Sequence, residues 1–160
     1  VFAVRSGGIM KHKKFLFVCT GNTCRSPMAA AALRQELKRR KIAWYTVQSA
    51  GLHAETGAPM SAHAKQALDE RKIPYAPDFC ARQLNEKMIQ EAFAIVCVSE
   101  RHREQLQGRP NVTSLRALAD CDLPDPYGQG VEAYRETLRA VCACLPAIIE
   151  GLGLNQINKS

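Results

Sequence analysis

The sequence lacks the residue spacing of a metal site. Its 160 residues include seven cysteines and four histidines, yet the chain contains no C-x-x-C pair. Structural zinc sites usually draw ligands from such closely spaced pairs. We therefore expect no metal and no other cofactor.

Long apolar runs are also missing. No stretch approaches the roughly 20 apolar residues that cross a bilayer. The opening VFAVRSGGIMKHKK has no apolar segment typical of a signal peptide. The cysteines are odd in number, and their spacing suits no small disulfide scaffold. These features predict free thiols, a cytoplasmic setting and no membrane partner.

The first few residues precede the first strand-like segment. Met10 is the expected natural start, with the residues before it left from cloning or from an upstream extension. We expect residues 1–12 to be an N-terminal extension. Residues 13–160 have the usual length of one domain with one core.

Aromatic residues are scarce, at 6% of the chain. The net charge of +7 allows anionic partners, which include phosphate groups, acidic proteins and nucleic acid. Nucleic-acid binders combine basic residues with interleaved aromatics or a known motif, and neither pattern occurs here. We expect no nucleic-acid partner.

The sequence does contain a regular alternation of strand-like and helix-like segments. The strand-like runs are 14–19, 43–51, 93–99 and 111–115. The expected helices are 26–41, 59–72, 85–92, 100–107 and 131–152. This alternation predicts an α/β fold: a single domain with a four-stranded parallel sheet and helices on both faces.

A short loop, CTGNTCRSP, joins the first strand to the first helix. Sites in parallel sheets form beyond the carboxyl ends of strands, where this loop falls. Ser26 is expected to cap the helix, with Pro27 at its first position. Gly21 and Asn22 permit the unusual backbone angles that would turn N–H groups inward.

Cys19 and Arg25 give this loop its chemistry. Backbone N–H groups, a helix N-terminus and a guanidinium favour a thiolate and would also hold a phosphate dianion. Arg25 can bind two phosphate oxygens at once, and Ser26 can donate a hydrogen bond to the thiolate. A thiolate beneath a bound phosphoryl group is placed for in-line attack, which would form a cysteinyl-phosphate.

Such chemistry also needs a proton donor for the leaving group and a base to activate water. Asp125, in the Pro- and Gly-rich loop 122–130, is the candidate. Asp122 lies three residues earlier and is a competitor. An Asp-Pro pair by itself more often marks only a turn.

The string CTGNTCRSP, with Asp-Pro-Tyr much later in the chain, resembles the low-molecular-weight protein tyrosine phosphatase family. The likeness extends from residue 13 to about residue 150. It implies a four-stranded parallel sheet flanked by helices, and no metal. It also implies phosphorylated proteins as substrates, and phosphate or similar oxyanions as inhibitors.

The resemblance assigns roles to individual residues. Cys19 would be the nucleophile, Arg25 the phosphate clamp, and Asp125 the general acid and then the general base. The phosphate-binding loop would comprise Thr20, Gly21, Asn22, Thr23, Cys24, Arg25 and Ser26. Hydrogen bonds from Asn22, Ser49 and His63 would brace it. Without the resemblance, His63 would be an ordinary residue on a helix face.

Two positions in the substrate pocket bear on specificity. Tyrosine-specific members typically carry an apolar residue in place of Thr23 and two aromatics after the Asp-Pro pair. Here Tyr127 is followed by Gly128, and the combination resembles the protein arginine phosphatase branch. A hydroxyl beside the phosphorus can assist water or bond a guanidinium nitrogen. The sequence leans slightly toward phosphoarginine, with phosphotyrosine close behind.

Several alternatives stay open. In the family, the residue matched by Cys24 can form a disulfide with the nucleophile under oxidation, although Cys24 is equally explained as a small buried loop residue. An arsenate reductase on the same scaffold would need resolving cysteines, and Cys80 and Cys97 are poorly spaced for that. A catalytically inactive phosphate-binding module would need neither a thiolate nor a proton donor.

Overall fold

The computed structural model describes residues 12–156. The expected start at Met10 and nearly all of the extension 1–12 lie outside the described residues. Within residues 12–156, no helix is both long and apolar enough to span a membrane.

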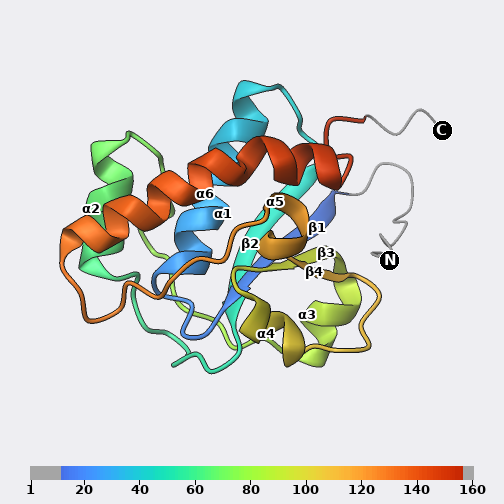
Figure 1. Cartoon of the computed structure of the whole chain (residues 1–160), viewed down its shortest axis with the longest axis horizontal. Coiled ribbons are helices and arrows are strands. Elements are labelled where there is room, and N and C mark those ends of the chain that lie inside the picture. The colour runs from blue at the N-terminus through green and yellow to red at the C-terminus, as the bar shows by residue number, and fades with distance from the viewer. Residues whose placement is uncertain (1–11, 157–160) are drawn as a thin grey trace.

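Four parallel strands form the central sheet: β1 (Lys13–Cys19), β2 (Tyr45–Gly51), β3 (Ala92–Cys97) and β4 (Val112–Ser114). Their spatial order is β2-β1-β3-β4 (Figure 1). Because all pairs are parallel, the carboxyl ends of the strands meet at one edge. Cys19 ends the inner strand β1, between the ends of β2 and β3.

Helices cover both faces of the sheet (Figure 1). One face carries α1 (Arg25–Arg39), α2 (Ala62–Glu70), α5 (Leu115–Ala119) and α6 (Val131–Gly151). The other carries α3 (Glu86–Glu91) and α4 (Glu100–Glu104). The predicted α/β fold, with a four-stranded parallel sheet and helices on both faces, is confirmed.

The core has two parts because β1 is buried on both faces. Phe15 and Phe17 point into the larger cluster with α1, α2 and α6. Leu16 and Val18 alternate with them and point into the smaller cluster under α3 and α4. An apolar strand without polar alternation is what a doubly covered strand requires.

The first helix begins earlier than predicted. It starts at Arg25 with Cys24 at the N-cap, so the expected cap at Ser26 is wrong and Pro27 is the third helical residue. The hydroxyl of Ser26 is instead engaged inside the preceding loop. Pro27 still lies in the first turn, where its missing N–H leaves no hydrogen bond unmade. The alanines at 29–32 are buried and let α1 pack closely.

Other boundaries differ in detail. The sequence predicts no helix at 115–119, where the structure has α5; the Ser114 hydroxyl accepts a hydrogen bond from the Ala117 N–H at 3.1 Å. A helix this short carries too little periodicity to be recognised from sequence. The last helix, α6, continues through Pro146 to Gly151.

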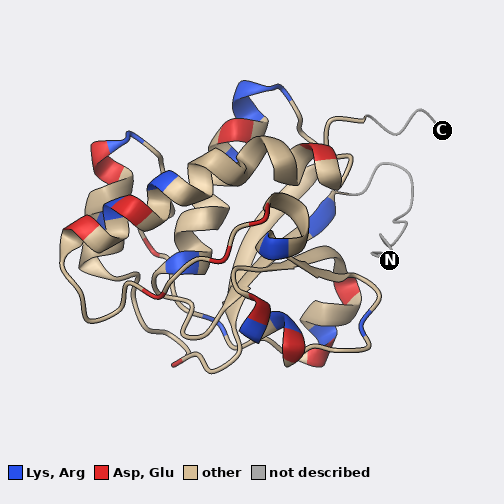
Figure 2. Ribbon diagram, viewed as in Figure 1, with Lys and Arg blue, Asp and Glu red and all other residues tan. Residues whose placement is uncertain are grey.

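Charged residues of both signs are interspersed along the helices (Figure 2). α6 carries glutamates and arginines, and α1 ends in Lys38 and Arg39, where cations complement the helix dipole. The net charge of +7 is therefore not gathered on one helix.

Candidate active site

The loop between β1 and α1 lines a cavity of about 210 Å³. Every residue from Cys19 to Arg25 contributes to its wall, and Asp125 and Tyr127 contribute from the loop before α6. The cavity thus brings together the predicted nucleophile, clamp and general acid from two segments far apart in the sequence. Its volume suits a phosphoryl group with part of a side chain.

The sulfur of Cys19 lies among hydrogen-bond donors. Its Sγ is 2.8 Å from the Ser26 hydroxyl oxygen and accepts a hydrogen bond from the Asn22 N–H at 3.3 Å. Cys19 is only 2% exposed. Burial raises the pKa of its thiol above the usual value, while Ser26, the Asn22 N–H and the Arg25 guanidinium pull that pKa down.

The sequence-based expectation that the loop favours the thiolate therefore needs correction. The donors are present and act in the expected direction, but the burial of Cys19 outweighs them. Burial at the end of an inner strand is a property of the whole fold, which the loop sequence alone does not express. The thiol must lose its proton before it can attack.

Arg25 is held between the cavity and the loop before α6. Its side chain is 7% exposed. Its Nη1 donates to the Leu123 carbonyl at 3.1 Å, and its Nη2 lies 3.5 Å from Asp125 Oδ2. The guanidinium is therefore fixed against the segment that carries the carboxylate.

Asn22 is the centre of the hydrogen bonds that brace the loop. Its φ of 58° lies in the left-handed region, and its side chain is fully buried. Nδ2 donates to the hydroxyls of Ser26 at 2.8 Å and Ser49 at 2.9 Å. Oδ1 accepts from the Arg82 N–H at 2.9 Å. One side chain thus links the loop to β2 and to the segment before α3.

Two glycines lie in or beside the loop. The left-handed backbone angle falls on Asn22, as its side chain allows, and Gly21 is not among the residues with positive φ. Gly51 lies at the end of β2, against the loop. A Cβ there would lie 2.5 Å from the Thr20 carbonyl oxygen and 3.1 Å from Asn22 Cβ. Gly51 therefore permits β2 to approach the loop closely.

His63 does not brace the loop through a hydrogen bond, contrary to the role implied by the resemblance. Its Nδ1 is buried and has no hydrogen-bond partner among the described residues. Its ring packs against Tyr134 of α6, with centroids 5.3 Å apart. The Tyr134 hydroxyl in turn lies 3.4 Å from Cys24 Sγ. Because α2 places His63 beside α6, its ring packs on Tyr134 and, within residues 12–156, makes no hydrogen bond to the loop.

Cys24 and Thr23 line the same cavity as Cys19. Cys24 is 5% exposed and, like Cys19, is a free thiol. The Thr23 hydroxyl is 3.6 Å from Cys24 Sγ and lies in the cavity wall. A polar side chain is therefore part of the cavity wall beside Cys24.

The two candidate carboxylates, Asp122 and Asp125, have different surroundings in the structure. Asp122 Oδ1 accepts a hydrogen bond from the Glu100 N–H at 2.8 Å, at the start of α4. Asp125 lines the cavity, with Oδ1 accepting from the Tyr127 N–H at 3.1 Å and with its side chain 52% exposed. Tyr127 itself is 75% exposed at the rim. Of the two carboxylates, Asp125 is the one that lines the cavity.

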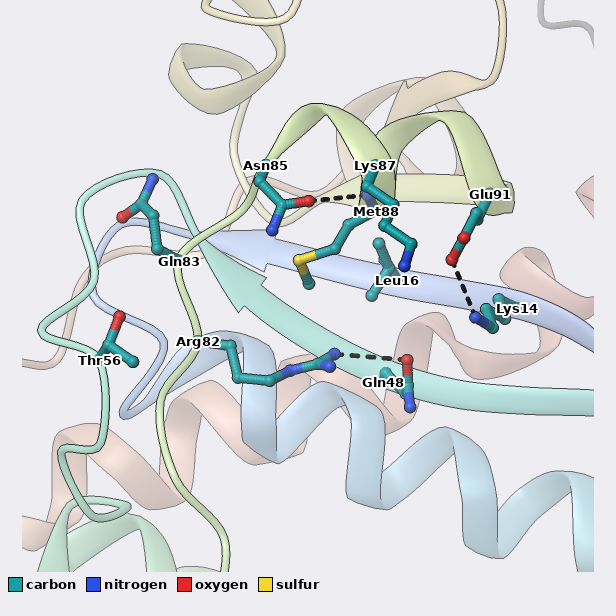
Figure 3. Close-up of a pocket in the computed structure, with 10 residues that line it drawn as sticks. All are labelled: Lys14, Leu16, Gln48, Thr56, Arg82, Gln83, Asn85, Lys87, Met88 and Glu91. Atoms are coloured by element: carbon teal, nitrogen blue, oxygen red, sulfur yellow. Dashed lines mark hydrogen bonds and ion pairs between the residues drawn. The ribbon is translucent and has the colours of Figure 1, made fainter.

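A larger cavity of about 510 Å³ lies elsewhere, beside β1 and β2 and next to α3 (Figure 3). It contains no cysteine, and its one carboxylate, Glu91, is paired with Lys14 at 3.0 Å. The Arg82 guanidinium in its wall donates to Gln48 at 3.3 Å (Figure 3). This cavity lacks a nucleophile in an anion-binding loop, so the smaller cavity is the candidate active site. Among residues 12–156, no group of three metal-ligating side chains is gathered.

A buried histidine beside the loop was missed from the sequence. His102 of α4 is 4% exposed. Its Nε2 lies 2.9 Å from the Thr20 hydroxyl, and its Nδ1 lies 2.8 Å from the Ser99 hydroxyl. Burial, followed by the positive charges of Arg25 and Arg101, lowers the pKa of His102 to about 4, against smaller opposing effects of Asp122 and Asp125.

This burial predicts a pH dependence of stability. Between about pH 6.5, the usual histidine pKa, and pH 4, the unfolded chain binds a proton that the folded chain does not. The free energy of unfolding should therefore fall by up to about 3 kcal/mol as the pH drops through this window, and the effect should level off below it.

Urea unfolding at several pH values measures this. His102→Asn should make the dependence between pH 6.5 and 4 shallower. Near pH 4.5 a smaller fall should remain, because hydrogen bonds from Arg39 and Arg40 lower the pKa of Glu36 to about 2 in the folded chain. His53→Asn, which removes an exposed histidine, is the matched control and should keep the wild-type dependence. A wild-type slope that survives in His102→Asn would assign the proton uptake to another group.

The chain matches known proteins over most of its length. Residues 14–159 match the family model described as low molecular weight phosphotyrosine protein phosphatase. A protein-arginine-phosphatase of Geobacillus stearothermophilus is 35% identical over 130 residues, which cover 76% of this chain and 84% of that protein. A probable low molecular weight protein-tyrosine-phosphatase, EpsP, of Ralstonia nicotianae is 32% identical over 145 residues, covering 85% of this chain and 96% of that protein.

Solved structures agree with these matches. The structure of the YwlE arginine phosphatase from Geobacillus stearothermophilus superimposes with a TM-score of 0.78 at 29% identity, covering 92% of this chain and 97% of that chain. The match with the family model, the relatives and the shared fold lead to one conclusion. This chain belongs to the low molecular weight phosphotyrosine protein phosphatase family.

Proposed function

We propose that this protein is a phosphatase that hydrolyses phosphorylated protein side chains through a cysteinyl-phosphate on Cys19. The observation that carries the proposal is that Cys19, Arg25 and Asp125 line the same cavity, of about 210 Å³. A nucleophile, a cation for the phosphoryl oxygens and a proton donor are the three parts that this reaction requires.

The first step would transfer the phosphoryl group to sulfur. Its oxygens would bind the Arg25 guanidinium and the loop N–H groups, which places phosphorus above Cys19 Sγ. The Cys19 thiol passes its proton to an oxygen of the bound phosphoryl dianion. The resulting thiolate attacks phosphorus as the bond to the leaving group breaks, and Asp125 donates a proton to that group. Ser26, 2.8 Å from the sulfur, stabilises the negative charge before attack.

The second step would release phosphate. Asp125, now ionised, accepts a proton from a water molecule while the oxygen of that water attacks phosphorus. The bond between phosphorus and sulfur breaks, and the sulfur leaves as thiolate. Inorganic phosphate and similar oxyanions would occupy the same cradle and compete with substrate. Asp125 serves both steps because its carboxylate is half exposed and reaches the cavity.

For the substrate, we propose phosphoarginine ahead of phosphotyrosine. The hydroxyl of Thr23 in the cavity wall can accept a hydrogen bond from a guanidinium nitrogen or orient the attacking water. Tyr127 is the one aromatic residue in the cavity wall, which leaves the rim open to a non-aromatic side chain. The relatives include proteins named for both activities.

Thr23→Ile tests this specificity. The substitution should lower kcat/KM for a phosphoarginine peptide relative to a phosphotyrosine peptide by roughly 10-fold, because an apolar branch removes the hydroxyl that favours the guanidinium. Thr23→Ser, which keeps the hydroxyl, is the matched control and should preserve the wild-type ratio. An unchanged ratio in Thr23→Ile would show that Thr23 does not select the substrate.

Activity itself is tested with para-nitrophenyl phosphate. Hydrolysis that is inhibited by inorganic phosphate supports the phosphatase. Phosphate binding without hydrolysis would indicate the inactive binding module.

An arsenate reductase would need a second reactive thiol, but burial raises the pKa of Cys97 to about 12 in β3. Arsenate reduction coupled to thioredoxin, lost in Cys80→Ser while hydrolysis persists, would revive that alternative.

We further propose that Cys24 protects the nucleophile. A peroxide would oxidise the Cys19 thiolate to a sulfenic acid, and the Cys24 thiol would then form a disulfide with it, releasing water. Both cysteines line the same cavity, which supports this pairing.

A catalytic thiol of this kind suits the reducing cytoplasm, where we propose that the enzyme works.

A further inference from the structure

His102 makes two hydrogen bonds that join separate parts of the site. Its ring bridges the Thr20 hydroxyl of the phosphate-binding loop, at 2.9 Å, and the Ser99 hydroxyl at the start of α4, at 2.8 Å. Ser99 stands at the N-cap of α4 but makes no side-chain cap bond there. The Ser99 hydroxyl is hydrogen-bonded to the imidazole of His102 instead.

The start of α4 also holds the segment that carries the general acid. The Glu100 N–H donates to Asp122 Oδ1 at 2.8 Å, and the Val98 carbonyl accepts from the Leu123 N–H at 3.1 Å. Residues 98–102 therefore contact both the nucleophile loop and the acid segment. Among these contacts, His102 is the one side chain that reaches the loop.

We propose that His102 is a positioning residue of the catalytic loop, acting through the hydroxyl of Thr20. This inference rests on the phosphatase function proposed above. The Thr20 carbonyl is already held by the His53 N–H at 2.9 Å. The bond from His102 fixes the side chain of the same residue, so Thr20 is restrained at both its main chain and its side chain.

The chemistry of a neutral imidazole suits this role. One ring nitrogen donates and the other accepts, so one of the two hydroxyls must donate to the ring and the other must accept from it. In either tautomer the ring therefore pairs with the Thr20 hydroxyl and the Ser99 hydroxyl at the same time. In the proposed mechanism, the N–H groups of the residues that follow Thr20 bind the phosphoryl oxygens. A donor that is out of place weakens binding of the transition state more than binding of the substrate.

Two substitutions separate the two bonds of His102. The amide of glutamine can reach the position of Nε2 and keep the contact with Thr20. The shorter asparagine reaches only the position of Nδ1 and keeps the contact with Ser99. Thr20→Val removes the hydroxyl at the other end of the bond while retaining the shape of the side chain.

Steady-state kinetics on para-nitrophenyl phosphate gives the readout, with wild type as the reference. We expect His102→Asn to lower kcat by roughly 10- to 100-fold with a small change in KM. His102→Gln should recover a large part of that loss. Thr20→Val should resemble His102→Asn, and the double variant should lose no more than either single variant.

Two controls separate positioning from general weakening of α4. Leu106→Ala removes packing of the same region against the smaller core cluster without touching the loop, so it should lower thermal stability but keep kcat. Glu104→Gln changes an exposed residue of α4 and should change neither.

The possible outcomes are distinct. An inactive wild type would overturn the phosphatase function itself. An active wild type whose kcat survives in His102→Asn would overturn the positioning role alone. Equal losses in the asparagine and glutamine variants, in proportion to their loss of thermal stability, would likewise make His102 a purely structural residue.

Discussion

Replacing Cys19 with serine should abolish turnover, with kcat falling on the order of 10⁴-fold or more. A serine hydroxyl at this position has no base beside it and is a far weaker nucleophile than a thiolate. Phosphate binding should survive, because Arg25 and the loop N–H groups remain in place. Calorimetric titration with phosphate, alongside para-nitrophenyl phosphate kinetics, separates these two effects.

The matched control for this prediction is Cys80→Ser. Cys80 is an exposed free thiol whose Sγ contacts only the Asp78 carbonyl, at 3.5 Å. The Cys80→Ser substitution should leave kcat unchanged. Activity in Cys19→Ser close to wild type would remove Cys19 from the mechanism, and loss of phosphate binding would instead point to a damaged loop.

Asp125→Asn should have the next largest effect, and its size should depend on the leaving group. An amide cannot donate the acidic proton, so kcat for phenyl phosphate should fall by roughly 10²- to 10³-fold. An aryl phosphate with a strongly electron-withdrawing ring needs little protonation and should lose much less in the phosphoryl-transfer step. Single-turnover measurements on both esters isolate this step from hydrolysis of the intermediate.

Asp122→Asn is the matched control, because Asp122 accepts the Glu100 N–H and does not line the cavity. It should preserve the dependence on leaving group. If Asp125→Asn slows both esters equally while Asp122→Asn selectively slows phenyl phosphate, the proton donor is Asp122.

The parts of the fold that are local in sequence were predictable. The runs at 14–19 and 93–99 are apolar enough to identify buried strands, and the intervening helices imply parallel pairing. The loop that lines the candidate active site was also predictable as one unit, because its residues are contiguous between one strand and one helix.

The parts that depend on contacts between residues far apart in the sequence could not be predicted. The sequence favoured Asp125 and kept Asp122 as a competitor, but it did not show that Asp122 accepts the Glu100 N–H at the start of α4. His63 carries the right side chain for a brace but packs on Tyr134. His102 is separated from Thr20 by most of the chain, and no local pattern links the two.

Main-chain contacts leave even less trace in a sequence. Arg82 braces Asn22 through its backbone N–H, which any residue except proline would supply. Gly51 is required only because another segment approaches it closely. The raised pKa of the Cys19 thiol is a similar case, since the loop donors are visible in the sequence but the burial that opposes them is not.

The most direct test of the mechanism is to trap the phosphorylated enzyme. Asp125→Asn slows the hydrolysis of the intermediate as well as its formation, so an activated aryl phosphate should load the enzyme faster than water unloads it. Rapid quenching followed by peptide mass spectrometry should find one phosphoryl group on the peptide that contains Cys19. Continued turnover with no phosphoryl group on Cys19, or with the group on another residue, would contradict the account.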